Sequence, residues 1–208
     1  MPIAVYVDFD DVLCETARAL AFMLEREFRK TVAFEDIHTF DLGQSFGLDA
    51  SDLQRLMELA HQPEFLGELA PVPGALEALR GWAAAGVEIH IVTGRPASTR
   101  TTSAAWLRNF DVPYSRLIFV DKYGRNLLPD GAEDAISLAE LMQMRFALAV
   151  EDAPQMADFL VRNMPGPVAM IRRPWNARAT IGTGNDPGQL HRCQDWAQIL
   201  QQFPAPGV

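Results

Sequence analysis

Three acidic residues follow the first apolar stretch of the chain within four positions. Residues 3–7, IAVYV, are apolar and β-forming, and Asp8, Asp10 and Asp11 come directly after them. Burying unpaired carboxylates costs free energy, and grouping several of them raises that cost. The acids are therefore either solvated at the end of a strand or arranged around a positive partner. Asp8 and Asp10 are two positions apart, so on leaving a strand they can face one site.

Three further strand ends supply a hydroxyl group with a glycine amide, a lysine, and a second acid pair. These residues are Thr93 and Gly94 after 87–92, Lys122 after 117–120, and Glu151 and Asp152 after 146–150. In open α/β sheets, ligands bind outside the carboxyl ends of the strands, where the strand order reverses. Each motif alone occurs often by chance, whereas four of them in order at four strand ends favour one shared site.

The combined set suits a phosphoryl group bound together with a divalent cation. Asp8, Asp10 and Asp152 offer the hard oxygen ligands that Mg²⁺ prefers, beside water and phosphate oxygens. The hydroxyl group, the glycine amide and the lysine are hydrogen-bond donors suited to phosphoryl oxygens. We therefore expect Mg²⁺ as the cofactor, since a cation among the acids explains how they tolerate one another.

Alternating strands and helices are expected to position these residues. Short apolar stretches rich in Val and Ile indicate buried strands, and helical spacing occurs between most of them. The predicted strands are residues 3–7, 87–92, 117–120, 146–150 and 168–171, and the predicted helices are residues 74–85, 96–110, 133–144, 154–163 and 193–202. This alternation predicts an α/β fold with a doubly wound, mostly parallel sheet.

One interval breaks the alternation. Between the first and second predicted strands the sequence contains no convincing strand, and apolar residues from Leu13 to Phe28 follow helical spacing. A second helix is predicted over residues 49–61, with Asp49 and Ser51 as candidate caps. We expect residues 15–71 to form an inserted helical cap over the edge of the sheet, and residues 1–14 and 72–208 to form the core domain.

Four motifs together resemble those of the haloacid-dehalogenase-like (HAD) superfamily of phosphohydrolases. They are DFDDVL, IVTGRP, Lys122 and VEDAP. The stretch PVPGALEALRGWAAAGVEIHIVTGRP is also similar to that superfamily's usual approach to its second motif, and the resemblance covers about residues 3–171. It implies a Rossmann-like core with a helical cap, Mg²⁺ dependence and an aspartyl-phosphate intermediate.

The resemblance also implies a role for each matched residue. Asp8 would be the nucleophile, and Asp10 would be the general acid and base. That proton cycle requires the pKa of Asp10 to lie above the pKa of Asp8. Thr93 would hold phosphoryl oxygens, and Lys122 would neutralise charge. The second acid also disfavours dehalogenation, because an alcohol leaving group needs a proton and a halide does not.

Two positions depart from the family pattern. Asp11 replaces the glycine that is common after the second acid, so the following turn can differ. The fourth motif reads Glu-Asp where Asp-Asp is usual, which leaves the direct metal ligand open between Glu151 and Asp152, with Asp152 favoured. Asp8 and Asp10 would complete the implied metal site.

The segment MIRRPWN, residues 170–176, resembles the 5′(3′)-deoxyribonucleotidase-like branch of this superfamily. The resemblance implies a 5′-nucleotidase acting on a nucleoside monophosphate, with Trp175 stacked on a base and Arg172, Arg173 or Asn176 in contact with polar groups. Trp175 can equally be a packing residue. Phe40 is a candidate to reach the leaving group, or else belongs to the core of the cap. Arg95 either assists Gly94 in binding the phosphate or pairs with an acid.

The composition limits the classes of partner and location. A net charge of −9 over 208 residues argues against binding a nucleic-acid polymer, whose affinity depends on clustered Lys and Arg. A local pocket with a metal can still bind a small anionic metabolite. The sequence contains no run of about 18 apolar residues and no signal stretch, so we expect a cytoplasmic protein without a membrane segment. The oligomeric state stays open.

Other functional classes share part of these features. A phosphatase of sugar phosphates or other small metabolites, and a phosphotransferase or phosphomutase of the same superfamily, would carry every motif described above. A non-catalytic phosphate-binding module is less compatible with an intact pair of Asp8 and Asp10. A phosphorelay receiver fits poorly, because Lys122 precedes the second acid pair and the long helical insert has no place in it.

Overall fold

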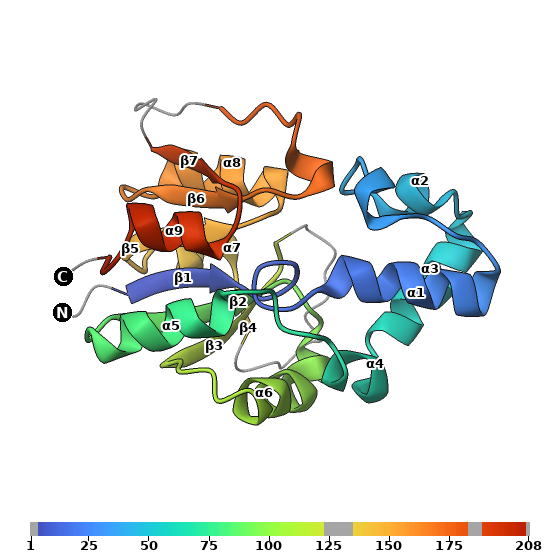
Figure 1. Ribbon diagram of the computed structural model, residues 1–208, viewed down its shortest axis with the longest axis horizontal. Helices are drawn as coiled ribbons and strands as arrows, with labels where there is room; N and C mark the ends of the chain where they lie inside the picture. Colours follow the sequence, from blue (N-terminus) through green and yellow to red (C-terminus); the bar gives the residue numbers. More distant parts are fainter. Residues whose placement is uncertain (1–3, 123–134, 183–188, 207–208) are drawn as a thin grey trace.

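The computed structural model describes residues 4–122, 135–182 and 189–206, and its centre is a parallel sheet (Figure 1). Among these residues seven strands follow the order β4-β3-β2-β1-β5-β6-β7, and every pairing between neighbours is parallel. The strands are β1 (Ala4–Asp8), β2 (Glu88–Thr93), β3 (Arg116–Val120), β4 (Ala135–Ile136), β5 (Phe146–Glu151), β6 (Val168–Ile171) and β7 (Leu190–Cys193). The strand order reverses at β1, which confirms the expected doubly wound α/β fold.

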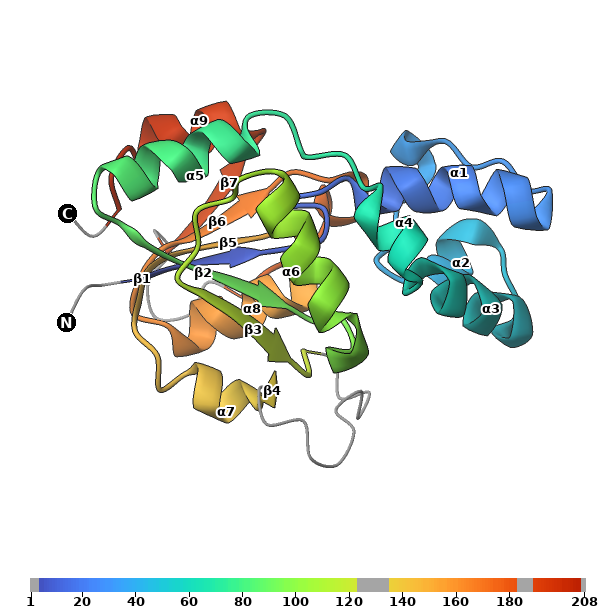
Figure 2. The ribbon, with the colours of Figure 1, turned by 90° about the horizontal axis from the view of Figure 1, so that it is seen from below.

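Two layers of helices cover the two faces of the sheet, as Figure 2 shows. The helices on one face are α5 (Ala75–Ala84), α6 (Arg100–Asn109) and α9 (Trp196–Gln202), and those on the other are α7 (Leu138–Leu141) and α8 (Pro154–Asn163). Along β1, Val5 and Val7 pack into the first layer and Tyr6 into the second, as the two-residue period of a strand requires. A strand buried on both faces reads as a continuous apolar run, which explains why the sequence pattern located it.

Four helices within residues 16–67 lie beyond the carboxyl ends of the strands (Figure 2). They are α1 (Thr16–Phe28), α2 (Leu42–Phe46), α3 (Ala50–Ala60) and α4 (Pro63–Gly67). These helices enclose an apolar cluster of their own, which includes Leu24, Phe46 and Leu56. Asp49 caps α3 as predicted, because its side chain accepts a hydrogen bond from the Asp52 N–H at 2.9 Å. The helices α2 and α4 were not predicted, since five residues are too few for a periodic pattern.

The five predicted strands are all present, and most predicted helices agree with the structure. The helix predicted over residues 133–144 is wrong. Residues 133–134 lie outside the described residues, and the rest form the two-residue strand β4 and the short helix α7, which begins at a capping box of Ser137 and Glu140. The last helix begins at Trp196 because Asp195 caps it, and the residues before it form the unpredicted edge strand β7. Within the described residues, no helix combines the length and the apolar character needed to span a bilayer.

Candidate active site

Lys122 joins two acids at the carboxyl end of the sheet. Its ammonium group donates to Asp8 Oδ1 at 2.5 Å and to Glu151 Oε2 at 3.0 Å. The three residues come from the end of β1, the loop after β3 and the end of β5, and all three are buried. Burial disfavours the charged form of Lys122, but the charges of the two acids outweigh burial and raise its pKa. Residues from three separate segments therefore form one buried ionic cluster.

Glu151 is held by four protein donors. Its Oε1 accepts from the backbone N–H groups of Asp152 and Ala153, each at 3.1 Å. Its Oε2 accepts from the Tyr6 hydroxyl group at 2.7 Å and from Lys122. The Glu151 side chain is completely buried. Glu151 therefore positions Lys122 and the loop after β5, and both of its carboxylate oxygens are engaged.

A cavity opens at this edge of the sheet, and Asp152 is the member of the second acid pair that lines it. The indole N–H of Trp175 donates to its Oδ2 at 2.8 Å, and the side-chain amide of Asn176 donates to its backbone carbonyl at 2.8 Å. Burial, followed by the charges of Glu151 and Asp8, raises the pKa of Asp152 well above its usual value. A cation near Asp152 would relieve this repulsion.

The expected contact between Asn176 and substrate is wrong. Asn176 is completely buried, and its side chain also donates to the Ile171 carbonyl at 2.8 Å and accepts from the Arg173 N–H at 3.0 Å. Trp175 is 7% exposed and lines the cavity, and its ring meets Phe34 edge-on with 5.8 Å between centroids. Both residues of this segment hold Asp152, a role that the sequence did not reveal.

Three carboxylates lie close enough to share a cation. One oxygen from each of Asp8, Glu151 and Asp152 lies within 4.8 Å of the others, and all three residues are buried. Because both Glu151 oxygens are already engaged by fixed donors, Asp8 and Asp152 are the acids best suited to bind a metal directly. Asp10 was expected to be a ligand too, but its carboxylate is paired with a guanidinium instead and is not part of this group.

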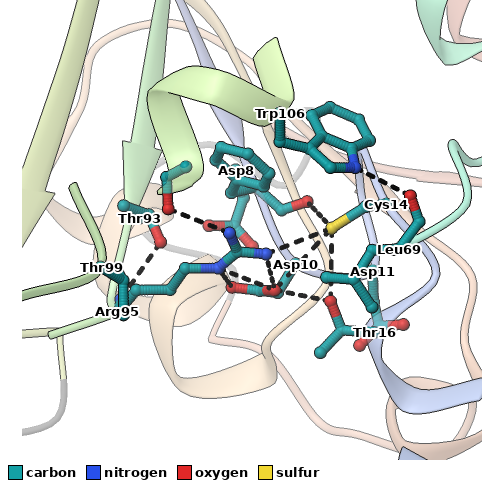
Figure 3. Close-up of polar contacts among 12 residues, drawn as sticks. Asp8, Asp10, Asp11, Cys14, Thr16, Leu69, Thr93, Arg95, Thr99 and Trp106 are labelled. Carbon is teal, nitrogen blue, oxygen red and sulfur yellow. Dashed lines mark hydrogen bonds and ion pairs between the residues drawn. The ribbon is translucent and has the colours of Figure 1, made fainter. Parts of the chain in front are cut away.

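Figure 3 shows that the Arg95 guanidinium faces the Asp10 carboxylate. Arg95 Nη2 donates to Oδ1 at 2.6 Å and Nε donates to Oδ2 at 2.9 Å, which makes a two-pronged ion pair. The Thr16 hydroxyl group donates to the same Oδ1 at 2.5 Å. Of the two roles considered for Arg95, pairing with an acid is therefore the one present. Thr16, the first residue of α1, was not recognised from the sequence.

The pKa values of the two acids have the opposite order to the expected one. Burial, followed by the charge of Glu151, raises the pKa of Asp8 well above its usual value, although Lys122 opposes this. Burial also disfavours ionisation of Asp10, but the charge and hydrogen bonds of Arg95 outweigh it and lower the pKa of Asp10. In this arrangement the guanidinium lowers the pKa of Asp10, whereas the proton cycle was expected to need a raised one.

Thr93 and Gly94 lie where β2 ends, beside the acids. Thr93 is completely buried, and its hydroxyl oxygen accepts the backbone N–H of Arg95 at 3.1 Å. Because the Thr93 oxygen is the acceptor in this bond, the Thr93 hydroxyl group can still donate its proton to another hydrogen bond. Gly94 lines the cavity. The end of β2 thus brings both predicted phosphate donors to the same edge of the sheet as Asp8 and Lys122.

The backbone at Asp11 explains how an aspartate can replace the glycine that is common at this position. Asp11 has a φ of 56°, in the left-handed region that favours glycine and that aspartate adopts more readily than most residues. Its carboxylate accepts from the backbone N–H of Ala17 at 3.0 Å. Glu15, the N-cap residue of α1, makes no side-chain cap bond, so Asp11 satisfies this helix end in its place. Burial raises the pKa of Asp11 to about 7.

A cavity of about 820 Å³ lies between the acid-bearing edge of the sheet and the helices of residues 16–67. Its sheet side includes Asp8, Asp10, Gly94, Arg95, Lys122 and Asp152. Its helical side includes Leu20, Ile37, Phe40, Leu42, Leu53, Met57 and Leu66. Phe40 lines the cavity and also packs against the apolar clusters, so it combines features of both expected roles. The helical segment also contributes Thr39, Asp41 and His61, so the charged edge of the sheet faces a wall that is mostly but not entirely apolar.

Comparison with known proteins identifies the family. The model of the family "5' nucleotidase, deoxy (Pyrimidine), cytosolic type C protein" matches residues 1–128. A curated protein of Halalkalibacterium halodurans, which carries the name "putative nucleotidase", is 22% identical over 192 residues, covering 92% of this chain and 88% of the relative.

Two solved structures illustrate the fold. A HAD family hydrolase of Deinococcus radiodurans R1, solved with bound phosphate and sodium, aligns with a TM-score of 0.57 and 16% identity, over 98% of this chain and 96% of that chain. Protein Tyrosine Kinase A of Mycobacterium tuberculosis aligns with a TM-score of 0.65 and 15% identity, over 97% of this chain and 98% of that chain. Identities this low establish the fold alone, and a hydrolase and a kinase share it.

The resemblance to the HAD superfamily is confirmed by the family match and by the fold. Because the family model matches well over half of the 208 residues, this chain is a HAD-like phosphatase that belongs to the family of 5′ nucleotidase, deoxy (pyrimidine), cytosolic type C proteins.

Proposed function

We propose that the protein hydrolyses the phosphate ester of a nucleoside monophosphate, with Mg²⁺ bound and through an aspartyl-phosphate intermediate. The observation that carries the proposal is the position of Asp8. Its side chain lines the cavity of about 820 Å³, and its Oδ1 accepts a hydrogen bond from the Lys122 ammonium group at 2.5 Å. A cavity of that size is within the usual range for small-molecule sites. Membership of the nucleotidase family supports the choice of substrate.

The donor set around Asp8 suits Mg²⁺. Asp8 and Asp152 would hold the ion, because their carboxylates lie together and the Glu151 oxygens are engaged by other donors. When bound, Mg²⁺ would screen the repulsion between the nucleophile and a dianionic phosphate and stabilise the charge of the transition state. The indole N–H of Trp175 would orient Asp152 toward the ion.

In the first step Asp8 would act as the nucleophile. One carboxylate oxygen forms a bond to phosphorus while the bond between phosphorus and the alcohol oxygen breaks. Asp10, in its protonated form, would give its proton to the departing alcohol oxygen.

In the second step water would attack the phosphorus of the aspartyl phosphate. Asp10 takes a proton from that water, the bond between Asp8 and phosphorus breaks, and inorganic phosphate leaves. The proton taken from water replaces the one given to the alcohol, so the cycle balances. Pairing with Arg95 lowers the pKa of Asp10, which favours the second step, in which Asp10 acts as the base, and disfavours the first step, in which Asp10 must carry a proton.

Three groups would hold the phosphoryl oxygens during both steps. Lys122 supplies a positive charge, and Thr93 supplies a hydroxyl proton, since its oxygen already accepts the Arg95 N–H. The backbone N–H of Gly94 would be the third donor. Such fixed donors stabilise charge that develops in the transition state and need no reorganisation at the moment of reaction.

The remaining expectations enter as parts of the same proposal. Residues 15–71 would act as the cap that encloses the nucleoside, over a core of residues 1–14 and 72–208. The four helices α1 to α4 and the apolar side of the cavity support this division. Phe40 and Trp175, which line the cavity, would pack against the base. A cytoplasmic location and a small phosphorylated metabolite as partner fit this function and stay predictions.

The test is phosphate release from deoxyribonucleoside and ribonucleoside monophosphates and from sugar phosphates, with Mg²⁺ and with excess chelator. Wild-type protein should release phosphate from at least one nucleotide only when Mg²⁺ is present. The Asp8→Asn variant should be inactive, while Asp36→Asn, which changes an exposed acid outside the cavity, should match the wild type. When the reaction is quenched with acid, the wild-type protein should carry a covalently bound phosphate, and the Asp8→Asn variant should carry no such phosphate.

The other outcomes separate the alternatives. Turnover of sugar phosphates alone would support the hydrolytic mechanism and refute the proposal that the substrate is a nucleotide. Transfer of phosphate to an added alcohol in preference to water would identify a phosphotransferase. Full activity of Asp8→Asn would refute the covalent mechanism.

A further inference from the structure

Arg95 lies beside the expected phosphate site, yet the protein itself uses its side chain. We infer that Arg95 is a positioning residue that sets the orientation of the Asp10 carboxylate, and that it is not a ligand of the substrate phosphate. The inference rests on the proposed function, in which Asp10 moves the protons. It replaces the alternative that Arg95 helps to bind phosphate.

All three nitrogens of the Arg95 guanidinium have protein partners. Nε and Nη2 hold the two oxygens of Asp10, Nη1 donates to the Ser103 hydroxyl group at 3.1 Å, and Nη2 also lies 3.4 Å from Cys14 Sγ (Figure 3). A guanidinium carries five N–H donors in a rigid planar fork. Turning this fork toward a phosphate would break the ion pair and the Ser103 bond together.

The surroundings of Arg95 also fix its place. The residue is 5% exposed, and its guanidinium carbon lies 4.0 Å from the centre of the Phe9 ring. Its backbone N–H is bound by the Thr93 hydroxyl oxygen, so the main chain is held as well. Arg95 lines the cavity, but its guanidinium, which stacks on Phe9, is bonded to Asp10. Rigid packing of this kind suits a support for another residue.

Asp10 is the exposed member of the pair. Its side chain is 31% exposed, against 4% for the side chain of Arg95, so Asp10 can reach a substrate or a water molecule. Thr16 holds Oδ1 from the other side at 2.5 Å. Arg95 and Thr16 together fix the plane of the carboxylate. A misplacement of about 1 Å at a reacting group can cost about 10²-fold in rate, so loss of this support should appear in kcat.

The test combines kinetics with phosphate binding. The Arg95→Met variant should lower kcat for the nucleotide substrate by about 10²-fold. Its KM, and the Kd of inorganic phosphate from titration calorimetry, should stay within about twofold of the wild type. The double variant Arg95→Met/Asp10→Asn should be no slower than Asp10→Asn alone, because Arg95 acts through Asp10.

Two further variants serve as controls for the effect of Arg95→Met. Arg95→Lys keeps the charge without the two-pronged geometry, and it should recover part of the lost kcat with an unchanged phosphate Kd. If Arg95→Met fails to fold by circular dichroism, Arg95→Lys carries the test alone. Arg162→Met, which removes a surface guanidinium paired with Asp158 on α8, should leave both constants unchanged.

Two results would contradict the inference that Arg95 acts through Asp10. A phosphate Kd that rises about tenfold or more in Arg95→Met or Arg95→Lys would make Arg95 a phosphate ligand, since charged hydrogen bonds carry that much affinity. Rate losses that multiply in the double variant would likewise refute action through Asp10. Failure of the proposed function is seen separately, as wild-type protein that releases no phosphate or as an Asp8→Asn variant that stays active.

Discussion

The two sides of the cavity are built on different physical principles. On the sheet side, buried charges hold one another: Lys122 is 1% exposed and joins Asp8 to Glu151. On the helical side, partly buried apolar groups such as Leu53 and Met57 line the space. Charges that are buried in pairs tolerate little change, because removing one leaves its partner uncompensated.

Apolar walls respond more gradually to change. Replacing one apolar side chain alters contact area and volume, and the cost is spread over many weak contacts. The sheet side should therefore fix the reaction, and the helical side should tune which alcohol carries the phosphate. Four substitutions, each with a matched partner, test this division from the largest expected effect to the smallest.

Replacing Lys122 should have the largest effect. Lys122→Met leaves Asp8 and Glu151 buried without a positive partner, so we expect the free energy of unfolding to fall by about 3–5 kcal/mol. Phosphatase activity should fall by at least about 10³-fold, because the positive charge that we propose for stabilising the phosphoryl group is gone. Urea denaturation and phosphate release measure the two effects.

The chain contains one other lysine, which serves as the control on the helical side. Lys30 donates to the Gly47 carbonyl at 2.5 Å near the surface. Lys30→Met should change the free energy of unfolding by less than about 0.5 kcal/mol and leave activity intact. Similar losses in both variants would contradict the contrast between the two sides.

Trp175 should show a smaller effect that is confined to the sheet side. Trp175→Phe removes the N–H that holds Asp152 Oδ2 at 2.8 Å and keeps an aromatic ring in the wall. Loss of a group that orients a metal ligand typically costs about 10–100-fold in metal affinity or activity. The Mg²⁺ concentration that gives half-maximal activity should rise accordingly.

The matched control for Trp175 is the ring that it meets from the helical side. Phe34→Leu removes that edge-on contact and leaves the indole N–H on Asp152. We expect an unchanged Mg²⁺ requirement in this variant. A Trp175→Phe variant with a wild-type Mg²⁺ requirement would show that Asp152 needs no orienting bond.

The contrast between the two sides also explains what sequence reasoning could find. Parallel strands buried on both faces read as apolar runs, and the residues after them must meet at one edge, so Asp8, Lys122 and Asp152 were predictable from order alone. The helix pattern located α1 and α3 because their apolar spacing extends over many residues.

The residues that hold the acids were harder to predict. Arg95 and Asp10 are 85 positions apart, and Trp175 and Asp152 are 23 apart, so no local pattern records that they pair. Asn176 was assigned to substrate because a motif gives a residue type but not the direction of its side chain. The lowered pKa of Asp10 follows from its contact with Arg95, and the raised pKa of Asp8 follows from burial and the charge of Glu151; the sequence revealed neither contact.

On the helical side, Met57 should affect substrate binding more than the reaction. Met57 lines the cavity, whereas Leu59 on the same helix packs into the apolar cluster of α1 to α4. Met57→Ala should raise KM by about tenfold with kcat unchanged within about twofold, because apolar contact with the leaving group is lost. Leu59→Ala should instead lower the free energy of unfolding by about 1–2 kcal/mol and keep KM. A kcat loss in Met57→Ala would place part of the chemistry on the helical side.

Asp11 should give the smallest effect, although it lies beside Asp10, the acid that we propose as the proton carrier. Asp11→Gly loses the side-chain bond to the Ala17 N–H but relieves the cost of a positive φ, so the two changes nearly cancel. We expect the free energy of unfolding to change by less than about 0.5 kcal/mol. Asp11→Ala loses the same bond and keeps the left-handed strain, so it should be destabilised by about 2 kcal/mol. Equal stabilities of the two variants in urea would show that backbone conformation at position 11 is not what selects glycine or aspartate there.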